Sequence, residues 1–250
     1  MDAYTSFAGV YDELMDNIPY EDWCEYLTGL LREWGIAPGQ KIVELGCGTG
    51  NMTRLLAKEG YRMTGIDQSG EMLAMAMQKE DREIPVFYVE QDMTRLTLPG
   101  AVDAVISVCD SMNYITRWED LCQVCKRVKR YLRKGGVFVF DMKTPYFYRE
   151  ICGDNTFAED REDVSFIWDN CFDEESRINE YALSLFVPCR EQGADLWRKF
   201  TEFHYQKAYD IQEVERAVKK SGLHLRHIYD AFTREPAKED SQRLYYIVEK

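Results

Sequence analysis

The chain has 250 residues, 45% of them hydrophobic, and a formal net charge of −13 at pH 7. The apolar content is enough for a sizeable core and excludes a disordered chain, while the acidic balance argues against nucleic acid as a partner. No apolar run approaches the ~20 residues that span a bilayer and no signal-peptide pattern is present, so we expect a cytoplasmic protein without a membrane partner.

The first 36 residues predict an N-terminal helical cap. Apolar side chains recur there at steps of three and four residues and would form one face of a helix, namely Trp23, Tyr26, Leu27, Leu30, Leu31 and Trp34. Pro38 and Gly39 end this segment because neither residue favours a continuing helix.

Strands and helices alternate over the next hundred residues. The pattern predicts helices at 51–59, about 69–79 and 118–132, and strands at 41–45, 62–66, 86–90, 101–108 and 137–140. Strands that alternate with helices imply right-handed crossovers and a parallel sheet. The sequence therefore predicts an α/β fold with a doubly wound sheet.

After Pro145 the pattern changes to a period of two. Apolar and polar residues alternate from about 163 to 208, and Gln192-Gly193 marks a turn. This alternation is typical of antiparallel strands with one buried face. We expect a small antiparallel β insertion over 146–208.

The chain returns to the main domain after the insertion. A last helix is expected at 211–221, followed by strands near 223–231 and 243–249. The predicted organisation is a helical cap, a main domain in two parts and the insertion, at 1–36, 37–145 with 209–250, and 146–208.

The first predicted strand ends in the glycine-rich loop Glu44-Leu45-Gly46-Cys47-Gly48-Thr49-Gly50. Such a loop lets the main chain approach a ligand and directs helix N–H groups toward it. The nicotinamide pattern G-x-G-x-x-G would require a glycine where Asn51 stands, and no Lys-Ser/Thr pair follows as in a P-loop. The loop therefore argues against a nicotinamide oxidoreductase.

The pattern E-x-G-x-G-x-G resembles the first motif of class I S-adenosylmethionine-dependent methyltransferases. Further segments resemble later motifs of that family in the same order, namely Gly65-Ile66-Asp67, Gln91-Asp92-Met93, Asp110-Ser-Met-Asn113-Tyr114 and Leu132-Arg-Lys-Gly135-Gly136. An ordered set of this kind is far more specific than a glycine loop alone.

The resemblance implies a Rossmann-like sheet of seven strands, six parallel and one antiparallel, with helices on both faces and S-adenosyl-L-methionine as cofactor. Asp67 would bond the ribose hydroxyls, Asp92 or its neighbouring main chain would meet the adenine, and Asp110 and Asn113 would line the methyl-transfer pocket. Two alternatives stay open, because Asp67 could cap the next helix and Glu44 could merely stabilise the loop. The full expected set of cofactor-binding residues is Tyr11, Glu44, Gly46, Cys47, Gly48, Gly50, Asn51, Asp67, Gln68, Asp92, Met93, Asp110 and Asn113.

A narrower resemblance covers the two ends of the chain. The segment Tyr4-x-x-Phe7-Ala8-x-x-Tyr11-Asp12 and the late insertion are similar to small-molecule methyltransferases such as amino-sugar N,N-dimethyltransferases and glycine N-methyltransferase-like enzymes. In that group N-terminal aromatic residues close over the cofactor, and the inserted strands build the acceptor pocket as a substrate lid.

No catalytic residue is identified from the sequence. Methyl transfer is an in-line displacement in which positioning does most of the work, and a general base is optional. His204 and Tyr11 are the candidates, against the alternatives of a strand histidine facing solvent or a neighbour and of a core aromatic residue. No metal is expected, because Cys122 and Cys125 lack a second ligand pair at zinc spacing.

The main hypothesis is methyl transfer to nitrogen or oxygen of a small-molecule acceptor. A methyltransferase acting on RNA or protein is one alternative, although the N-P-P-Y-like tetrad of some such enzymes is absent at Cys109-Asp110-Ser111-Met112. A non-catalytic S-adenosylmethionine-binding module is another. The acceptor is left open, as is the question of a homodimer.

Overall fold

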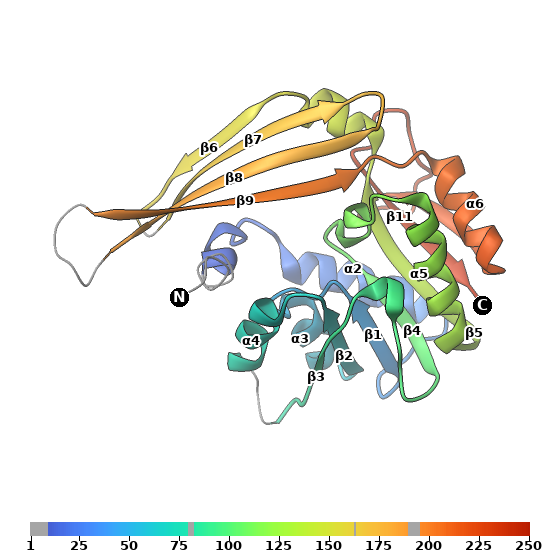
Figure 1. Cartoon of the computed structure of the whole chain (residues 1–250). Coiled ribbons are helices and arrows are strands. Elements are labelled where there is room, and N and C mark those ends of the chain that lie inside the picture. The colour runs from blue at the N-terminus through green and yellow to red at the C-terminus, as the bar shows by residue number, and fades with distance from the viewer. Residues whose placement is uncertain (1–9, 80–82, 163, 190–195) are drawn as a thin grey trace.

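The computed structural model describes residues 10–79, 83–162, 164–189 and 196–250. A seven-stranded sheet lies between helices, and a second sheet of four antiparallel strands extends over one end of it (Figure 1). The long strands of this second sheet pass above the N-terminal segment and the ends of the first strands.

The large sheet has the strand order β10-β11-β5-β4-β1-β2-β3. Only β11 runs antiparallel to its neighbours, so six strands share one direction and the predicted doubly wound sheet is confirmed. Its strands are β1 (Lys41–Leu45), β2 (Arg62–Asp67), β3 (Phe87–Glu90), β4 (Val102–Ser107), β5 (Leu132–Lys143), β10 (His224–Asp230) and β11 (Arg243–Glu249).

Helices cover both faces of this sheet and bury two apolar clusters against it. On one face Leu27, Leu30 and Leu31 of the first long helix are fully buried against strand residues. On the other face Leu121 and Val214 belong to the second cluster. The helices are α2 (Tyr20–Glu33), α3 (Asn51–Lys58), α4 (Gly70–Gln78), α5 (Trp118–Tyr131) and α6 (Ile211–Ser221). Burying one such leucine contributes roughly 1.5–3 kcal/mol, so these faces hold the helices in place.

The N-terminal region differs from the single helical cap expected over residues 1–36. A helical turn spans 10–14, and α2 begins only after Pro19 and ends at Glu33. Proline lacks an N–H group and cannot continue a helix from the preceding turn, which explains the break. Tyr4, Phe7 and Ala8 of the N-terminal motif lie outside the described residues.

The second sheet has the order β6-β7-β8-β9 and confirms the predicted antiparallel insertion. Its strands are β6 (Thr156–Asp160), β7 (Ser165–Asp173), β8 (Ile178–Pro188) and β9 (Trp197–Lys207). β6 was not expected, because all five of its residues are exposed and show no alternation of buried positions. The Gln192-Gly193 turn lies outside the described residues.

Three short helical elements lie in the connections between the strands and helices. The short elements are η1 (Met93–Arg95), η2 (Ser111–Tyr114) and η3 (Phe147–Cys152). β5 starts at Leu132, earlier than the expected Val137, because Leu132 already pairs with Val102 before a register shift. The extents of the three predicted domain segments stay a prediction.

Candidate functional site

The glycine loop follows β1 at the carboxyl edge of the large sheet. Gly46 N and Cys47 N both donate to Ile66 O of β2, at 2.7 and 3.1 Å, which anchors the loop to the neighbouring strand. Gly46, Gly48 and Gly50 all have positive φ, a conformation that other residues rarely adopt.

The space around the loop differs between its glycines. A Cβ atom at Gly46 would lie 2.6 Å from the Ser111 Cβ, so that glycine permits close packing inside the protein. A Cβ atom at Gly48 would meet nothing within 4 Å. The main chain at Gly48 is therefore open to a ligand, as a nucleoside cofactor would require.

Asp67 at the end of β2 holds the loop through main-chain hydrogen bonds. Its Oδ2 accepts from Gly48 N at 2.8 Å and its Oδ1 accepts from Ser69 N at 2.9 Å. Each carboxylate oxygen has a second lone pair that could accept from a ligand hydroxyl. Ser69, not Asp67, caps α4, since its hydroxyl accepts from Met72 N at 3.2 Å, and Gln68 beside Asp67 is exposed.

Glu44 lies beneath the loop. It is 2% exposed, and its carboxyl group accepts a hydrogen bond from the Thr53 hydroxyl of α3. Burial raises the pKa of Glu44 from 4.5 to about 8, because a charged carboxylate is poorly solvated there. This placement favours stabilisation of the loop over contact with a ligand.

Residues 10–19, here called the N-terminal strap, are tied to the glycine loop by Asp12. Asp12 Oδ1 accepts from Thr49 Oγ1 at 2.7 Å and from Asn51 Nδ2 at 3.0 Å, and Asp12 forms an ion pair with Lys79. Lys79 Nζ also donates to Thr49 O at 3.1 Å and to Asn51 Oδ1 at 3.0 Å. Burial alone would raise the pKa of Asp12, but these donors outweigh it and lower that pKa.

Asp12 and Lys79 were missing from the residues expected from the sequence. The motif ending in Tyr11-Asp12 was the available signal for Asp12, whereas nothing local singles out Lys79. Tyr11 itself lies near the end of β4: burial raises the pKa of its phenol, and Tyr20, Cys109, Tyr114 and Asp110 add to that shift.

Asp92 and Met93 follow β3 on the other side of the loop. The Asp92 carboxylate caps η1, accepting from Thr94 N at 2.8 Å and from Thr94 Oγ1 at 2.7 Å. The Met93 methyl group lies 3.7 Å from the position of a Cβ atom at Gly46. Met93 is thus an apolar neighbour of the loop.

Asp110 after β4 is the centre of a buried ionic cluster. Its Oδ1 accepts from Arg243 Nη2 and its Oδ2 from Gln206 Nε2, both at 2.8 Å, and Lys143 Nζ lies 3.4 Å away. Arg243 Nη1 also pairs with Asp141 Oδ2 at 2.5 Å. Burial would raise the pKa of Asp110, but Lys143 and Arg243 lower it below its usual range.

Asn113 bridges the two sheets and is fully buried. Its Nδ2 donates to Lys143 O of β5 at 3.1 Å and to Lys207 O of β9 at 2.9 Å, and its Oδ1 accepts from Lys143 N at 2.9 Å. This geometry gives Asn113 a structural role and leaves no N–H group for a ligand.

The inner face of the four-stranded sheet brings an aromatic cluster over the end of β4. Tyr114 Oη lies 2.6 Å from Tyr181 Oη of β8 and 3.2 Å from His204 Nδ1 of β9. The His204 ring stacks on Tyr181 with centroids 4.6 Å apart, and Trp168 of β7 packs against Tyr181 at 5.2 Å. His204 therefore faces neighbours across the site. Sequence reasoning named Tyr114 only as part of a motif and gave neither Tyr114 nor Tyr181 a role in the site.

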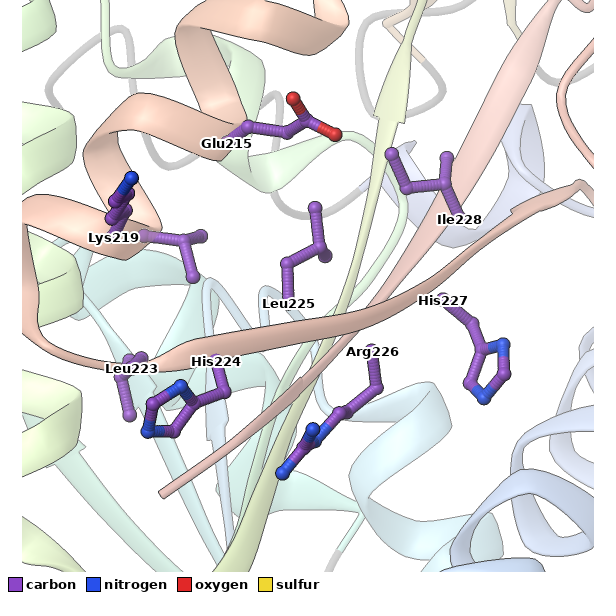
Figure 2. A pocket seen from close by; sticks show the side chains of 9 residues that line it. Glu215, Lys219, Leu223, His224, Leu225, Arg226, His227 and Ile228 are labelled. Carbon is purple, nitrogen blue, oxygen red and sulfur yellow. The ribbon is translucent and has the colours of Figure 1, made fainter.

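A separate pocket of about 480 Å³ lies between α6 and β10 (Figure 2). Glu215 and Lys219 line it from the helix, and Leu225 and Ile228 project toward it from the strand. It opens near the amino end of β10, with three strands between β10 and β1, whereas the glycine loop lies at the carboxyl edge of the sheet. It is distant from the cluster described above.

Within the part of the chain that the structure describes, no group of three or more His, Cys, Asp or Glu side chains could hold a metal ion. In the same residues, no helix combines the length and the apolar character needed to cross a bilayer.

Comparison with known proteins gives consistent matches along the chain. Residues 42–136 match a family model described as a methyltransferase domain. The putative methyltransferase YqeM of Bacillus subtilis is 34% identical over 99% of this chain and 97% of its own length.

Solved structures agree with these matches. An S-adenosylmethionine-dependent methyltransferase from Clostridium acetobutylicum has a TM-score of 0.87 and 27% identity, covering 99% of both chains. CalS10, an amino pentose methyltransferase from Micromonospora echinaspora, has a TM-score of 0.76 and 17% identity, covering 96% of this chain and 97% of its own. At 17% identity, the similarity to CalS10 shows a shared fold alone.

Proposed function

The chain belongs to the S-adenosylmethionine-dependent methyltransferases, and from this premise we propose that it methylates a nitrogen or oxygen of a small molecule by in-line displacement. The observation that carries the proposal is the cluster of Tyr114, Tyr181 and His204, which the four-stranded sheet holds over the end of β4. Ligands of open α/β sheets bind at this edge, so the sheet acts as a lid over the acceptor.

The cofactor-binding residues are assigned on the open side of the glycine loop. Gly48 and its neighbours offer main chain to the cofactor, Asp67 accepts from its ribose hydroxyls with Gln68 beside it, and Met93 packs on its adenine next to Asp92. When bound, S-adenosylmethionine supplies a methyl group already activated by its sulfonium sulfur. The protein has to hold the cofactor, align the acceptor with the methyl group and enclose both away from water.

The N-terminal strap closes the site from the opposite side. Tyr11 covers the cofactor, and Asp12 fastens the strap to Thr49 and Asn51 of the loop. Asp110 and Asn113 hold the wall of the pocket in place rather than bind the cofactor, since their polar groups are committed to protein partners.

An amine is favoured over a hydroxyl group as the acceptor. Aromatic rings and carboxylates around a cavity stabilise a cationic amine, and Trp168, Tyr181 and Glu202 lie on the inner face of the lid. CalS10, which shares the fold, acts on an amino pentose. The net charge of −13 argues against RNA as the methylated molecule.

Two predictions about the whole protein stand beside this proposal. All eight cysteines are free thiols, which supports the expected cytoplasmic location, where thiols stay reduced. The homodimer stays a prediction.

A methyl-transfer screen tests the proposal. Alkylamines, amino sugars, hydroxy acids, a short peptide and tRNA are each offered with S-adenosylmethionine, and released S-adenosylhomocysteine is measured. Turnover with a small amine or amino sugar, and none with tRNA, is expected. Turnover with tRNA or the peptide alone would overturn the small-molecule assignment.

A further inference from the structure

We propose that Glu202, His204 and Tyr114 form a proton relay that deprotonates a basic amine for methylation. The inference rests on the proposed function, because it concerns the acceptor of the same site. A protonated amine has no lone pair and cannot act as a nucleophile, so an enzyme that accepts one near neutral pH must remove its proton.

The three side chains come together only in the folded chain. Tyr114 ends η2, whereas Glu202 and His204 alternate along β9 and so share its inner face. Tyr114 Oη lies 3.2 Å from His204 Nδ1, and His204 Nε2 lies 3.4 Å from Glu202 Oε2. Phenol, imidazole and carboxylate are thus arranged in series.

The ring of His204 is oriented by stacking, and the strand that carries it is held by hydrogen bonds. The ring lies nearly parallel to that of Tyr181, at an interplanar angle of 10°. Farther along β9, Gln206 donates to Asp110 at 2.8 Å and Lys207 O accepts from Asn113 at 2.9 Å. These bonds fix β9 against the segment that carries Tyr114.

Tyr114 is placed to meet the acceptor. Tyr114 is 39% exposed, and its hydroxyl group lies within hydrogen-bonding distance of Tyr181 and His204. Partial burial raises the pKa of the phenol, and the carboxylates of Asp110 and Glu202 raise it further. The hydroxyl therefore keeps its proton and cannot be the final base, but it can pass a proton on.

The relay moves one proton from the acceptor to His204 through the Tyr114 hydroxyl group. The acceptor N–H proton moves to Tyr114 Oη while the Tyr114 hydroxyl proton moves to His204 Nδ1. The electron pair of the broken N–H bond stays on nitrogen as its lone pair. The imidazolium carries the proton beside the Glu202 carboxylate, which stabilises it, and loses it later to water.

The relay requires one tautomer of neutral His204. Nδ1 must be bare to accept from Tyr114, so the ring proton must lie on Nε2, facing Glu202. The ¹⁵N spectrum of the full-length protein with S-adenosylhomocysteine measures this without any acceptor. His224 and His227 on β10 serve as internal references, and H204Q identifies the signals of His204.

Tyr114→Phe is the deciding variant for the tautomer. It should shift the His204 signals toward a mixture of tautomers, because the donor to Nδ1 is lost. Tyr205→Phe is the matched control, since Tyr205 is 47% exposed and points to the opposite face of β9. A ring proton on Nδ1 in the wild type, or no response to Tyr114→Phe, overturns the relay.

Kinetics provides the second readout, with an amino pentose and its N-aryl counterpart as probes. Tyr114→Phe should lower kcat for the alkylamine about 10²–10⁴-fold and hardly affect the aryl amine, which is already unprotonated at neutral pH. His204→Ala should regain turnover with added imidazole. Equal losses of kcat for both probes would overturn the relay. If the wild type turns over neither probe, the proposed acceptor class is contradicted, and the ¹⁵N measurement of the His204 tautomer tests the relay by itself.

Discussion

The Asp12 carboxylate of the N-terminal strap accepts a hydrogen bond from the Thr49 hydroxyl of the glycine loop, with 2.7 Å between Oδ1 and Oγ1. The two residues are 37 positions apart, and the same Asp12 oxygen accepts from Asn51. One carboxylate thus links the strap to the loop on which the cofactor is proposed to lie.

Replacing Asp12 with alanine should therefore weaken cofactor binding. The strap loses its ion pair with Lys79 and its bonds to the loop, so it is held less firmly against the loop. We expect the Kd of S-adenosylhomocysteine to rise about tenfold, or ~1.4 kcal/mol, by calorimetric titration. Glu13→Ala is the control, because the Glu13 side chain is exposed; an equal loss there would contradict the specific role of Asp12.

Asp67→Asn tests the proposed ribose contact. An amide keeps one acceptor atom and the side-chain shape but cannot accept from two hydroxyl groups as well as from Gly48 N and Ser69 N. Affinity for S-adenosylhomocysteine should fall roughly 10–100-fold, with an unchanged far-UV circular dichroism spectrum. Unchanged affinity would remove Asp67 from the ribose.

Glu44→Gln should change how stability depends on pH. The pKa of Glu44 is raised from 4.5 to about 8, so the folded state binds its proton more tightly than the unfolded state does. The stabilisation from protonated Glu44 is complete below about pH 4.5 and is lost as pH rises to about 8, at no more than ~1.4 kcal/mol per pH unit.

The measurement compares urea unfolding of wild type and Glu44→Gln at pH 5 and pH 8. Glutamine is neutral throughout and can still accept from the Thr53 hydroxyl. The free energy of unfolding of the variant, relative to that of the wild type, should increase as pH rises. Parallel stability curves would show that Glu44 does not titrate in this range.

Arg243→Met should destabilise the fold. Arg243 is 15% exposed and pairs with both Asp110 and Asp141, the latter fully buried. Removing one partner of a buried charge pair costs about 3–5 kcal/mol, and adding Asp141→Asn should recover part of the loss. The control is Arg226→Met, whose pair with Glu249 is more exposed, and which should cost less than ~1 kcal/mol in chemical denaturation. Similar losses in both variants would contradict this assignment.

Local patterns were enough to predict most elements of the large sheet. α6 begins and ends at the residues expected, Ile211 and Ser221, because an apolar face at helical spacing and a following glycine define it. β6 escaped prediction because its residues are uniformly exposed, so no alternation marks it. Pro19 was a visible signal of the break between residue 14 and α2, but the helical periodicity after it favoured a single helical segment in the prediction.

The residues of the candidate site also fall into those that the sequence indicated and those that only the structure revealed. Gly46, Gly48 and Asp67 could be found from the sequence, because a strand end followed by glycines at fixed spacing needs positive φ and main-chain access. His204 could only be guessed, Tyr114 was named only as part of a motif, and Tyr181 was given no role in the site. Their contacts span 67 and 90 positions and leave no periodic trace in the sequence.

By itself, the sequence determined the doubly wound sheet and the glycine loop, since these depend on periodicity and on spacing within one strand–loop–helix unit, and the resemblance of its ordered motifs to a known family indicated the cofactor class. Only the tertiary structure decided that Asp12 fastens the strap, that Asn113 bridges the sheets and that His204 faces Tyr114. The physical reason is that a hydrogen bond depends on distance in space, and the packing of one sheet over another sets that distance for residues far apart in the chain.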